Sequence, residues 1–333
     1  MNRITFCLLL PVAALSIAWT LFSALPVTAA DDPAGQPRID RVQDGAKGQL
    51  QVMIDGKEAF VYQHGQDQDL AHYYPVRSPS GKSMTVQKTE PFPHHRSFWF
   101  GDRVRLAGQK RDASFYAPLY SQVDKKDPKS PFRDRVRHLE FVPGKVTNDR
   151  AEIGMKLVWE MDLNTPVIDE DRKMRVVALG DGQYFLDVTF TVTAAHGDVT
   201  FTSDWVHYAW PYIRMNKEFS VQGGGTIISS EGGKNQKETN GKEAKWVDYY
   251  NTVEGETEGL AFFSHPDNPQ PHKWLTRDYG CFGPRRIDAK SGTKFTLKEG
   301  ESLVRRIGVL VHRGDTQTAK VAEQYERYAK GEL

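Results

Sequence analysis

The sequence predicts a mainly β protein, a large antiparallel β-sandwich of the supersandwich type with a C-terminal helix. Three observations support this fold. Runs of alternating apolar and polar residues, rich in Val, Thr and aromatic residues, recur along most of the chain. Turns containing Gly, Asp or Pro separate these runs at short spacing. Helical periodicity is convincing only near the end, where Val321, Tyr325 and Tyr328 recur every three or four residues.

The N-terminal residues 1–29 have the pattern of a secretory signal peptide. Arg3 gives a basic start, a long apolar run follows, and small residues ending at Ala29 suit the cleavage site. Because the apolar run is long, an uncleaved membrane anchor is the alternative. Residues 30–36 are then a polar linker, and residues 37–333 form a single β-sandwich domain. We therefore expect a periplasmic or secreted protein.

The charge of the chain excludes some partners. The formal net charge is +1, and removal of Arg3 with the signal peptide leaves 0. A neutral chain has no electrostatic preference for nucleic acid or for an anionic membrane. No later segment is apolar enough to cross a bilayer, so we expect no stable membrane insertion after signal cleavage. Cys281 is the only cysteine beyond the signal and is interpreted as a packed residue, with a reactive thiol as the alternative.

The predicted strands follow in order along the chain. Asp55-Gly56 between two apolar runs predicts a hairpin over residues 50–62. Further strands are predicted at residues 84–86, 98–100, 151–161, 173–179, 184–193, 199–201, 246–250 and 259–263, and a closing hairpin pairs residues 293–297 with 302–311. Two segments interrupt this order: 102–134 is predicted to be a long surface excursion and 222–241 a flexible loop. Asp315 and Gly331 are predicted to bound the final helix.

The aromatic residues of the predicted excursion allow two interpretations. Phe115, Tyr116 and Tyr120 lie between prolines and charged residues. They either cover a pocket or form a local mini-core, because long loops are often functional or packed on themselves.

Two proline-rich segments carry the side chains best suited to chemistry. Segment 90–100 places two imidazoles and a guanidinium just before an aromatic strand. Segment 264–280 follows a buried strand, and its prolines stiffen a loop that holds further polar side chains. We predict that the two segments meet at one mouth of the sandwich and form one pocket.

Several short stretches resemble a known family. Residues 94–100, 246–249, 265–268 and 274–280 are similar, in order and spacing, to motifs of the secreted "methane oxygenase PmoA" family, a domain of unknown function in exported planctomycete-type proteins. The resemblance covers residues 50–314. It departs from the family at 91–95, where Pro-Phe-Pro-His-His replaces Asp-His-Pro-His-His. We do not expect methane oxidation, because the membrane subunit of that name is built from transmembrane helices.

The predicted site residues combine proton transfer with sugar binding. Imidazoles exchange protons near neutral pH, guanidiniums bind carboxylates or sugar oxyanions, and aromatic faces stack on sugars. The alternatives are structural: satisfied histidines, salt bridges that fix the loops, and packed tryptophans. The predicted catalytic residues are His94, His95, His265, Arg277 and Asp267, and the predicted substrate-binding residues are Arg96, Trp274, Tyr279, Asn268, Trp246 and Asp248.

A metal site is a weaker alternative. Adjacent histidines of a strand point to opposite faces, so His94 and His95 are not expected to bind one metal ion together. A site would need one of them together with His265, His207 or Asp267. No spacing in the sequence is diagnostic of a metal, and the cofactor is unknown from sequence.

Three functions follow from these residues. The first is a carbohydrate-active enzyme in which His95 or His265 acts as acid or base, Arg277 holds an oxyanion and Trp274 stacks on the sugar. The second is a non-catalytic protein that binds a glycan or a cell surface. The third is a metal-binding protein. The expected partner is a carbohydrate or another small molecule.

Overall fold

The computed structural model describes residues 38–127, 129–203, 209–269, 273–286 and 295–333. Residues 36–333 belong to one compact unit. The predicted signal peptide, 1–29, and the predicted linker, 30–36, lie outside the described residues and stay predictions. Among the helices that the structure describes, none is long and apolar enough to span a bilayer.

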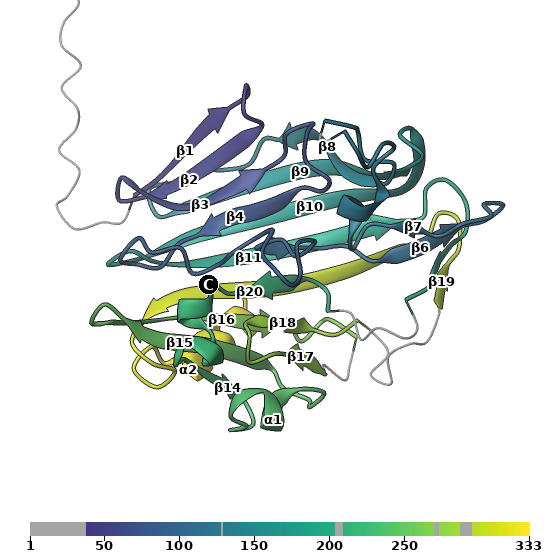
Figure 1. Ribbon diagram of the computed structural model, residues 1–333. Coiled ribbons are helices and arrows are strands. Elements are labelled where there is room, and N and C mark those ends of the chain that lie inside the picture. Colours follow the sequence, from purple (N-terminus) through teal and green to yellow (C-terminus); the bar gives the residue numbers. More distant parts are fainter. Residues whose placement is uncertain (1–37, 128, 204–208, 270–272, 287–294) are drawn as a thin grey trace, which may run out of the picture. The chain divides into compact units, whose positions relative to one another are not determined.

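Strands of the described residues form two large antiparallel sheets and one small sheet (Figure 1). Sheet A has the order β1 (Ile39–Asp44), β2 (Gln49–Ile54), β3 (Lys57–Gln63), β4 (His72–Val76), β5 (Phe98–Trp99), β13 (Tyr212–Arg214), β18 (Cys281–Pro284) and β17 (Trp274–Thr276). Sheet B has the order β14 (Thr226–Ser229), β15 (Trp246–Val253), β16 (Glu256–Ser264), β20 (Ser302–Arg313), β11 (Gln183–Thr193), β10 (Thr165–Gly180), β9 (Arg150–Met161) and β8 (Arg135–Val142). Sheet C has the order β19 (Phe295–Leu297), β12 (Val199–Phe201), β6 (Arg103–Leu106) and β7 (Ala113–Ser114).

Helices are few and short within the described residues. They are η1 (Pro118–Ser121), η2 (Lys217–Phe219), η3 (Val221–Gly223), α1 (Asn235–Thr239) and α2 (Val321–Ala329). The prediction of a mainly β, large antiparallel sandwich with a C-terminal helix is confirmed.

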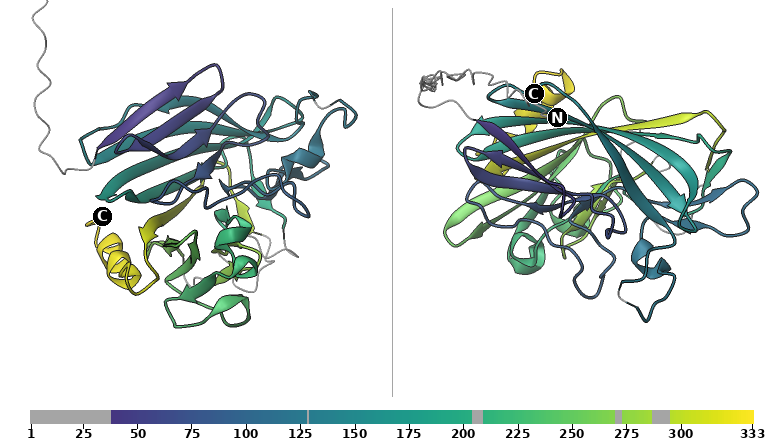
Figure 2. Two further views of the ribbon diagram at one scale, coloured as in Figure 1. Left: turned by 60° about the vertical axis from the view of Figure 1, so that its left-hand side comes forward. Right: turned by 90° about the horizontal axis from the view of Figure 1, so that it is seen from above.

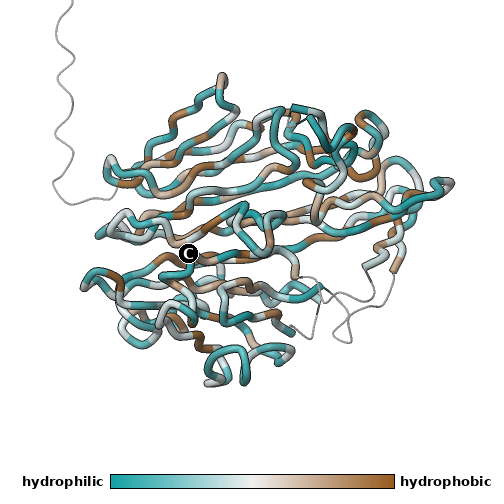
Figure 3. Tube along the Cα trace, viewed as in Figure 1, coloured by the Kyte–Doolittle hydropathy of each residue, from teal (hydrophilic) through white to brown (hydrophobic). Residues whose placement is uncertain are grey.

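The main core lies between sheets A and B. Apolar and polar residues alternate along many strands (Figure 3), whereas the central strand β16 is buried on both faces. Phe98 of β5 meets Phe262 of β16, with ring centroids 6.1 Å apart. The Tyr184 hydroxyl of β11 donates to the Ala59 carbonyl of β3 at 3.1 Å. Each fully buried aromatic side chain here contributes about 1.5–3 kcal/mol of hydrophobic stabilisation.

A second apolar cluster lies under helix α2, which covers the other face of sheet B (Figure 2). Phe185 and Phe263 of the sheet pack against Tyr328 and Tyr325, with ring centroids 5.2 and 5.6 Å apart. The tyrosines recur at three-residue spacing on one face of the helix. The apolar stripe read from the sequence therefore docks on the sheet.

The predicted helix start differs from the observed one. Helix α2 begins at Val321, after Lys320, which has a left-handed backbone conformation. The carboxylate of Asp315 accepts the Thr318 backbone N–H at 2.8 Å, in the turn before the helix. Gly331, with φ of +76°, lies just past the end of the helix as predicted.

Three other local predictions were wrong. The segment 102–134 contributes β6 and β7 to sheet C, and the predicted loop 222–241 contains β14 and α1. The closing hairpin does not form, because β19 pairs with β12 while β20 lies between β16 and β11. Periodicity identifies a strand, but its partner depends on contacts distant in sequence.

Candidate functional site

The two histidines of the first proline-rich segment lie in turns that precede β5. The His95 backbone N–H donates to the Phe92 carbonyl at 3.0 Å, which closes a turn. As a result, the rings of His94 and His95 lie on the same side, with centroids 4.6 Å apart. The expectation of opposite faces was wrong because it assumed an extended chain.

Arg96 holds this segment in place. Its side chain is fully buried and forms an ion pair with Asp69, with Nε 3.1 Å from Oδ1 and Nη2 bonded to Oδ2. Its Nη1 also donates to the Pro93 carbonyl at 3.0 Å. A fully buried fork that is used in this way is not open to a ligand, so the predicted substrate contact at Arg96 is not supported.

One face of β5, β13, β18 and β17 points away from sheet B. On these strands Phe98 and Phe282 contact Phe262 of sheet B, so the residues next to them face outward. Trp99 pairs with Tyr212, and Arg214 pairs with Cys281. Arg285 lies four residues beyond Cys281, and Arg277 lies two residues beyond Leu275 of β17, so alternation places both on this outward face. We call this set the outer patch; it consists of Trp99, Tyr212, Arg214, Arg277, Cys281 and Arg285.

Aromatic side chains from two other segments cover the outer patch. The His95 ring stacks on Phe92 with centroids 4.9 Å apart and lies 5.3 Å from the Trp99 ring. Phe92 in turn lies 5.1 Å from the Tyr279 ring, between centroids. The Tyr116 hydroxyl is 3.1 Å from His95 Nε2. Residues from segments 90–100 and 264–280 therefore do meet here.

The excursion contributes to this cover as well as to the core. Tyr120, an exposed residue, places its hydroxyl 3.3 Å from His94 Nδ1. Phe115 instead is fully buried and packs against Trp159 of sheet B at 5.1 Å between ring centroids. Phe115 thus belongs to the main core and not to a local mini-core, while Tyr116 and Tyr120 contact the two histidines.

The three arginines of the outer patch have no carboxylate partner among the described residues. Arg214 and Arg285 are 8% and 9% exposed, and neither Nε atom has a described hydrogen-bond partner. Burial lowers the pKa of both groups, and the charge of Arg277 lowers that of Arg285 further. Arg214 lies over the Tyr279 ring at 4.5 Å and donates to the Tyr279 carbonyl. Neutral partners stabilise these cations less than carboxylates would.

The same environment affects two other groups. Burial, with the charges of His94 and Arg214, lowers the pKa of His95 to about 3, so its imidazole is neutral at pH 7. Burial raises the pKa of Cys281 to about 12 despite the neighbouring arginines. The thiol therefore stays protonated, as expected for a packed cysteine, and the reactive-thiol alternative is not supported.

The first half of segment 264–280 lies elsewhere, on the face of sheet B that α2 covers. His265 Nε2 is 3.0 Å from Arg306 Nη1, and its ring lies 5.0 Å from that of Tyr328. Asp267 is exposed and pairs with His265 Nδ1 at 3.2 Å. The Asn268 amide bonds to the Arg306 backbone in both directions, at 2.7 and 2.8 Å. These residues brace strand ends and do not join His95.

Three other predicted contacts also face away from the outer patch. Trp274 is fully buried in the main core, where its Nε1 donates to the Ala244 carbonyl at 2.7 Å. Trp246 is 6% exposed and belongs to the apolar cluster under α2. Asp248 is buried and accepts bonds from Thr316 at 2.6 Å and His312 at 3.1 Å. None of the three presents a free face or oxygen to a sugar.

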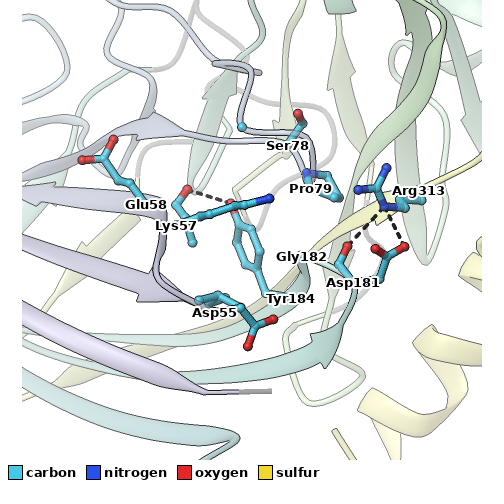
Figure 4. Close-up of a pocket in the computed structure, with 12 residues that line it drawn as sticks. Asp55, Lys57, Glu58, Ser78, Pro79, Asp181, Gly182, Tyr184 and Arg313 are labelled. Atoms are coloured by element: carbon cyan, nitrogen blue, oxygen red, sulfur yellow. Dashed lines mark hydrogen bonds and ion pairs between the residues drawn. The ribbon is translucent and has the colours of Figure 1, made fainter. Parts of the chain in front are cut away.

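The structure also has a cavity of about 230 Å³ that is lined by none of the outer-patch residues (Figure 4). It is bounded by the β2–β3 turn, residues 78–81 and the β10–β11 turn. Three of its charged side chains are paired: Arg313 binds Asp181 at 2.8 Å, and Glu58 binds Arg77 at 2.6 Å. None of the predicted site residues lines it.

Metal ligation finds no support in the part of the chain that the structure describes. No three His, Cys, Asp or Glu side chains gather there as ligands. His207, one predicted partner, lies outside the described residues.

Sequence reasoning missed Tyr116 as a partner of His95 and missed Arg214, Tyr212 and Arg285 altogether. Arginine and tyrosine alternate in Tyr212-Ile213-Arg214, as on one face of a strand. That signal alone does not distinguish a ligand-binding face from a solvated one.

The fold and the outer patch together define the class of protein: a large antiparallel β-sandwich in which arginine and tyrosine side chains line one face of a sheet. The model of a family of unknown function, DUF6807, matches residues 49–326, and the chain belongs to this family. The resemblance to the PmoA-like family was therefore wrong, since nothing in the comparisons indicates a methane-oxygenase family. No curated protein matches the sequence.

Solved structures with a similar fold are remote. The GH36 α-galactosidase AgaA of Geobacillus stearothermophilus has 8% identity and a TM-score of 0.42 over 85% of this chain and 42% of its own. Galactose 1-epimerase of Lactobacillus acidophilus has 8% identity and a TM-score of 0.36 over 85% of this chain and 100% of its own. Heparan sulfate lyase HepC of Pedobacter heparinus has 8% identity and a TM-score of 0.31 over 80% of this chain and 30% of its own. This chain thus spans less than half of the length of the α-galactosidase.

Proposed function

We propose that this is an exported carbohydrate-active enzyme that performs acid–base chemistry on a sugar at the outer patch, with Tyr116 and His95 as its proton-transfer pair. One observation supports it above the others. Buried His95 places Nε2 3.1 Å from the Tyr116 hydroxyl, while its Nδ1 has no hydrogen-bond partner among the described residues. A buried, incompletely bonded imidazole costs stability, and such costs concentrate at functional sites.

The proposed chemistry is a two-step relay. A proton leaves a sugar carbon or hydroxyl for the Tyr116 oxygen, while the Tyr116 hydroxyl proton moves to His95 Nε2. The reverse transfer returns a proton to the sugar and restores both residues. The low pKa leaves His95 unprotonated at pH 7, so Nε2 carries a lone pair, and a rise of this pKa on substrate binding would make it a stronger base. A positioned acid–base group of this kind contributes about 10²–10⁴-fold in rate.

Other groups around the pair suit a sugar. Phe92 and Tyr279 are both half-buried, so the exposed part of each ring can contact the apolar face of a pyranose, while Phe92 also stacks on His95 and Arg214 lies over Tyr279. Arg277 is also half-buried, and among the described residues its side chain donates only to the neighbouring Thr276 carbonyl, at 3.1 Å. It retains donors for a sugar oxygen.

Proton exchange in D₂O tests this function whichever bond of the sugar reacts. Hexoses, hexuronates and their disaccharides are incubated with the protein, and ¹H NMR records loss of C–H signals, anomer exchange and bond cleavage together. We expect at least one sugar to react faster with the protein than without it. His95→Gln and Tyr116→Phe should each slow that reaction by about 100-fold. Tyr120→Phe, at an exposed tyrosine beside His94, is the matched control and should change it little.

The non-catalytic alternative has one observation in its favour. The described outer patch contains no carboxylate, whereas most glycosidases use two. Sugar binding that leaves every proton signal unchanged, and that survives both substitutions, would replace the enzyme by a glycan-binding protein.

A further inference from the structure

We propose that the sugar bound at the outer patch carries an anionic group, a carboxylate or a sulfate, and that Arg214, Arg277 and Arg285 bind this group. The inference rests on the proposed function, because it names the substrate class of the same site.

Strand geometry brings the three guanidiniums to one face. Arg214 of β13 pairs in register with Cys281 of β18. Arg285 is four residues beyond Cys281 and forms a bridge with Ala209, so alternation places it on the same side of the sheet. Leu275 of β17 pairs with Gly283, and Arg277 follows Leu275 by two residues. Arg277 and Arg214 both act on the ionisation of Cys281, which lies between them.

Elsewhere in the described chain, most buried arginines are neutralised. Arg96 is paired with Asp69 and Arg172 with Glu170, each with a carboxylate oxygen at bonding distance. By contrast, the only hydrogen bond from the Arg285 side chain in the described residues goes to the Asn240 amide oxygen, at 3.3 Å. Several unpaired cations removed from water are costly, and a bound anion would offset that cost.

Arg305 is a fourth unneutralised guanidinium in the described residues, and it is next to this set. It is 1% exposed, and its Nη2 donates to the Arg285 carbonyl at 3.2 Å. Burial lowers the pKa of Arg305 to about 10, so it is still charged at pH 7. It adds positive potential behind the outer patch.

The aromatic cover argues for a sugar over a free inorganic anion. A free carboxylate or sulfate ion needs only the guanidinium forks. Phe92 and Tyr279 are half-buried and add exposed apolar ring surface, which would contribute little to an ion without an apolar face. Burial is the main cause of the low pKa of His95, and the charge of Arg214 adds to it, so an anion bound beside Arg214 would oppose that smaller contribution and raise the pKa of His95.

Calorimetric titration with defined probes tests the inference. The probes are D-glucuronate, D-galacturonate, glucose 6-sulfate, D-glucose, D-galactose and sodium sulfate, at low ionic strength. We expect one anionic sugar to bind at least about tenfold more tightly than its neutral counterpart and than sulfate alone. The uronates and the sulfated sugar distinguish the two anionic groups.

Substitutions connect the affinity to the arginines. Arg285→Gln should weaken anionic-sugar binding about tenfold and leave neutral-sugar binding unchanged, whereas Arg277→Gln should weaken anionic-sugar binding about tenfold and neutral-sugar binding by less. Arg313→Gln, at an arginine paired with Asp181 and Glu256, is the control for loss of one positive charge. Thermal unfolding of each variant shows that it is folded. In addition, the His95 imidazole should titrate at higher pH in the complex, by NMR.

The outcomes separate this inference from the function it rests on. If neutral sugars bind as tightly as anionic ones, or only inorganic sulfate binds, or no probe binds, the anionic-sugar inference is overturned. If a neutral sugar also exchanges protons in D₂O in a way that depends on His95, the proposed enzyme stands and only its substrate class is wrong.

Discussion

The outer patch of sheet A and the α2-covered face of sheet B are built from the same kinds of side chains. Both present arginines, tyrosines and a histidine on the face of an eight-stranded sheet that points away from the main core. On sheet B, Asp187 lies between Arg175 and Arg306 at 3.0 and 2.8 Å. On sheet A, no described carboxylate takes that place.

This difference distinguishes a sheet face whose polar side chains hold the fold together from one whose polar side chains can bind a ligand. Where each cation has a carboxylate, the polar groups mainly hold elements together, as Arg306 holds His265 and Asn268. Where cations and a histidine nitrogen stay unsatisfied, folding has not used their bonding capacity, which is available to a ligand. The residue types alone do not distinguish the two faces.

The largest expected effect is on sheet B. Asp187→Ala leaves two half-buried arginines without their shared carboxylate, so we expect the free energy of unfolding to fall by about 2–3 kcal/mol. Urea denaturation measures this loss. Asp267→Ala, which removes an exposed carboxylate, is the control and should cost less than about 0.5 kcal/mol. Equal costs would show that this face does not depend on its ion pairs.

The pH dependence of stability should have opposite signs for two histidines. The pKa of His95 falls from 6.5 to about 3 on folding, so the unfolded state binds more protons below pH 6.5 and stability falls as the pH drops toward 3. Between pH 6.5 and about pH 5 this costs about 2 kcal/mol, and His95→Gln should remove that part of the slope. His72 and His138, whose pKa values fall to about 4, contribute the same sign.

On sheet B, His312 should act in the opposite direction. Burial lowers its pKa, but the Asp248 carboxylate raises it more, so the folded-state pKa is above 6.5. Its stabilising effect is complete below pH 6.5 and is lost as the pH rises through the folded-state value. His312→Gln should flatten the profile on the alkaline side only. Urea titrations at several pH values measure both effects, and slopes of equal sign would contradict the contrast.

The smallest effect is expected in the outer patch. Arg285→Met replaces a buried, unneutralised guanidinium by an apolar side chain of similar length, so we expect stability to rise by about 1 kcal/mol while anionic-sugar binding weakens at least about tenfold. Thermal unfolding and calorimetry of the same variant measure the two effects. A loss of stability above about 1 kcal/mol would mean that Arg285 is structural, as Arg96 is.

The sequence by itself determined the mainly β class, most strand positions and the helix at 321–329. These depend on periods of two and 3.6 residues, which are local. It also indicated the segment with His94 and His95, because imidazoles beside prolines and a buried strand are visible locally. It could not show that Arg96 binds Asp69, since this partner is 27 residues away.

Tertiary structure alone decided which polar groups are satisfied. Tyr279 reaches Phe92, which stacks on His95, while His265, ahead of Tyr279 in the same segment, bonds to Arg306 on the other sheet. Arg214 and Arg285 join the site only because β13 pairs with β18, strands separated by more than sixty residues. The physical reason is that side-chain charge and direction are local properties, whereas burial and partners are set by strand order and register.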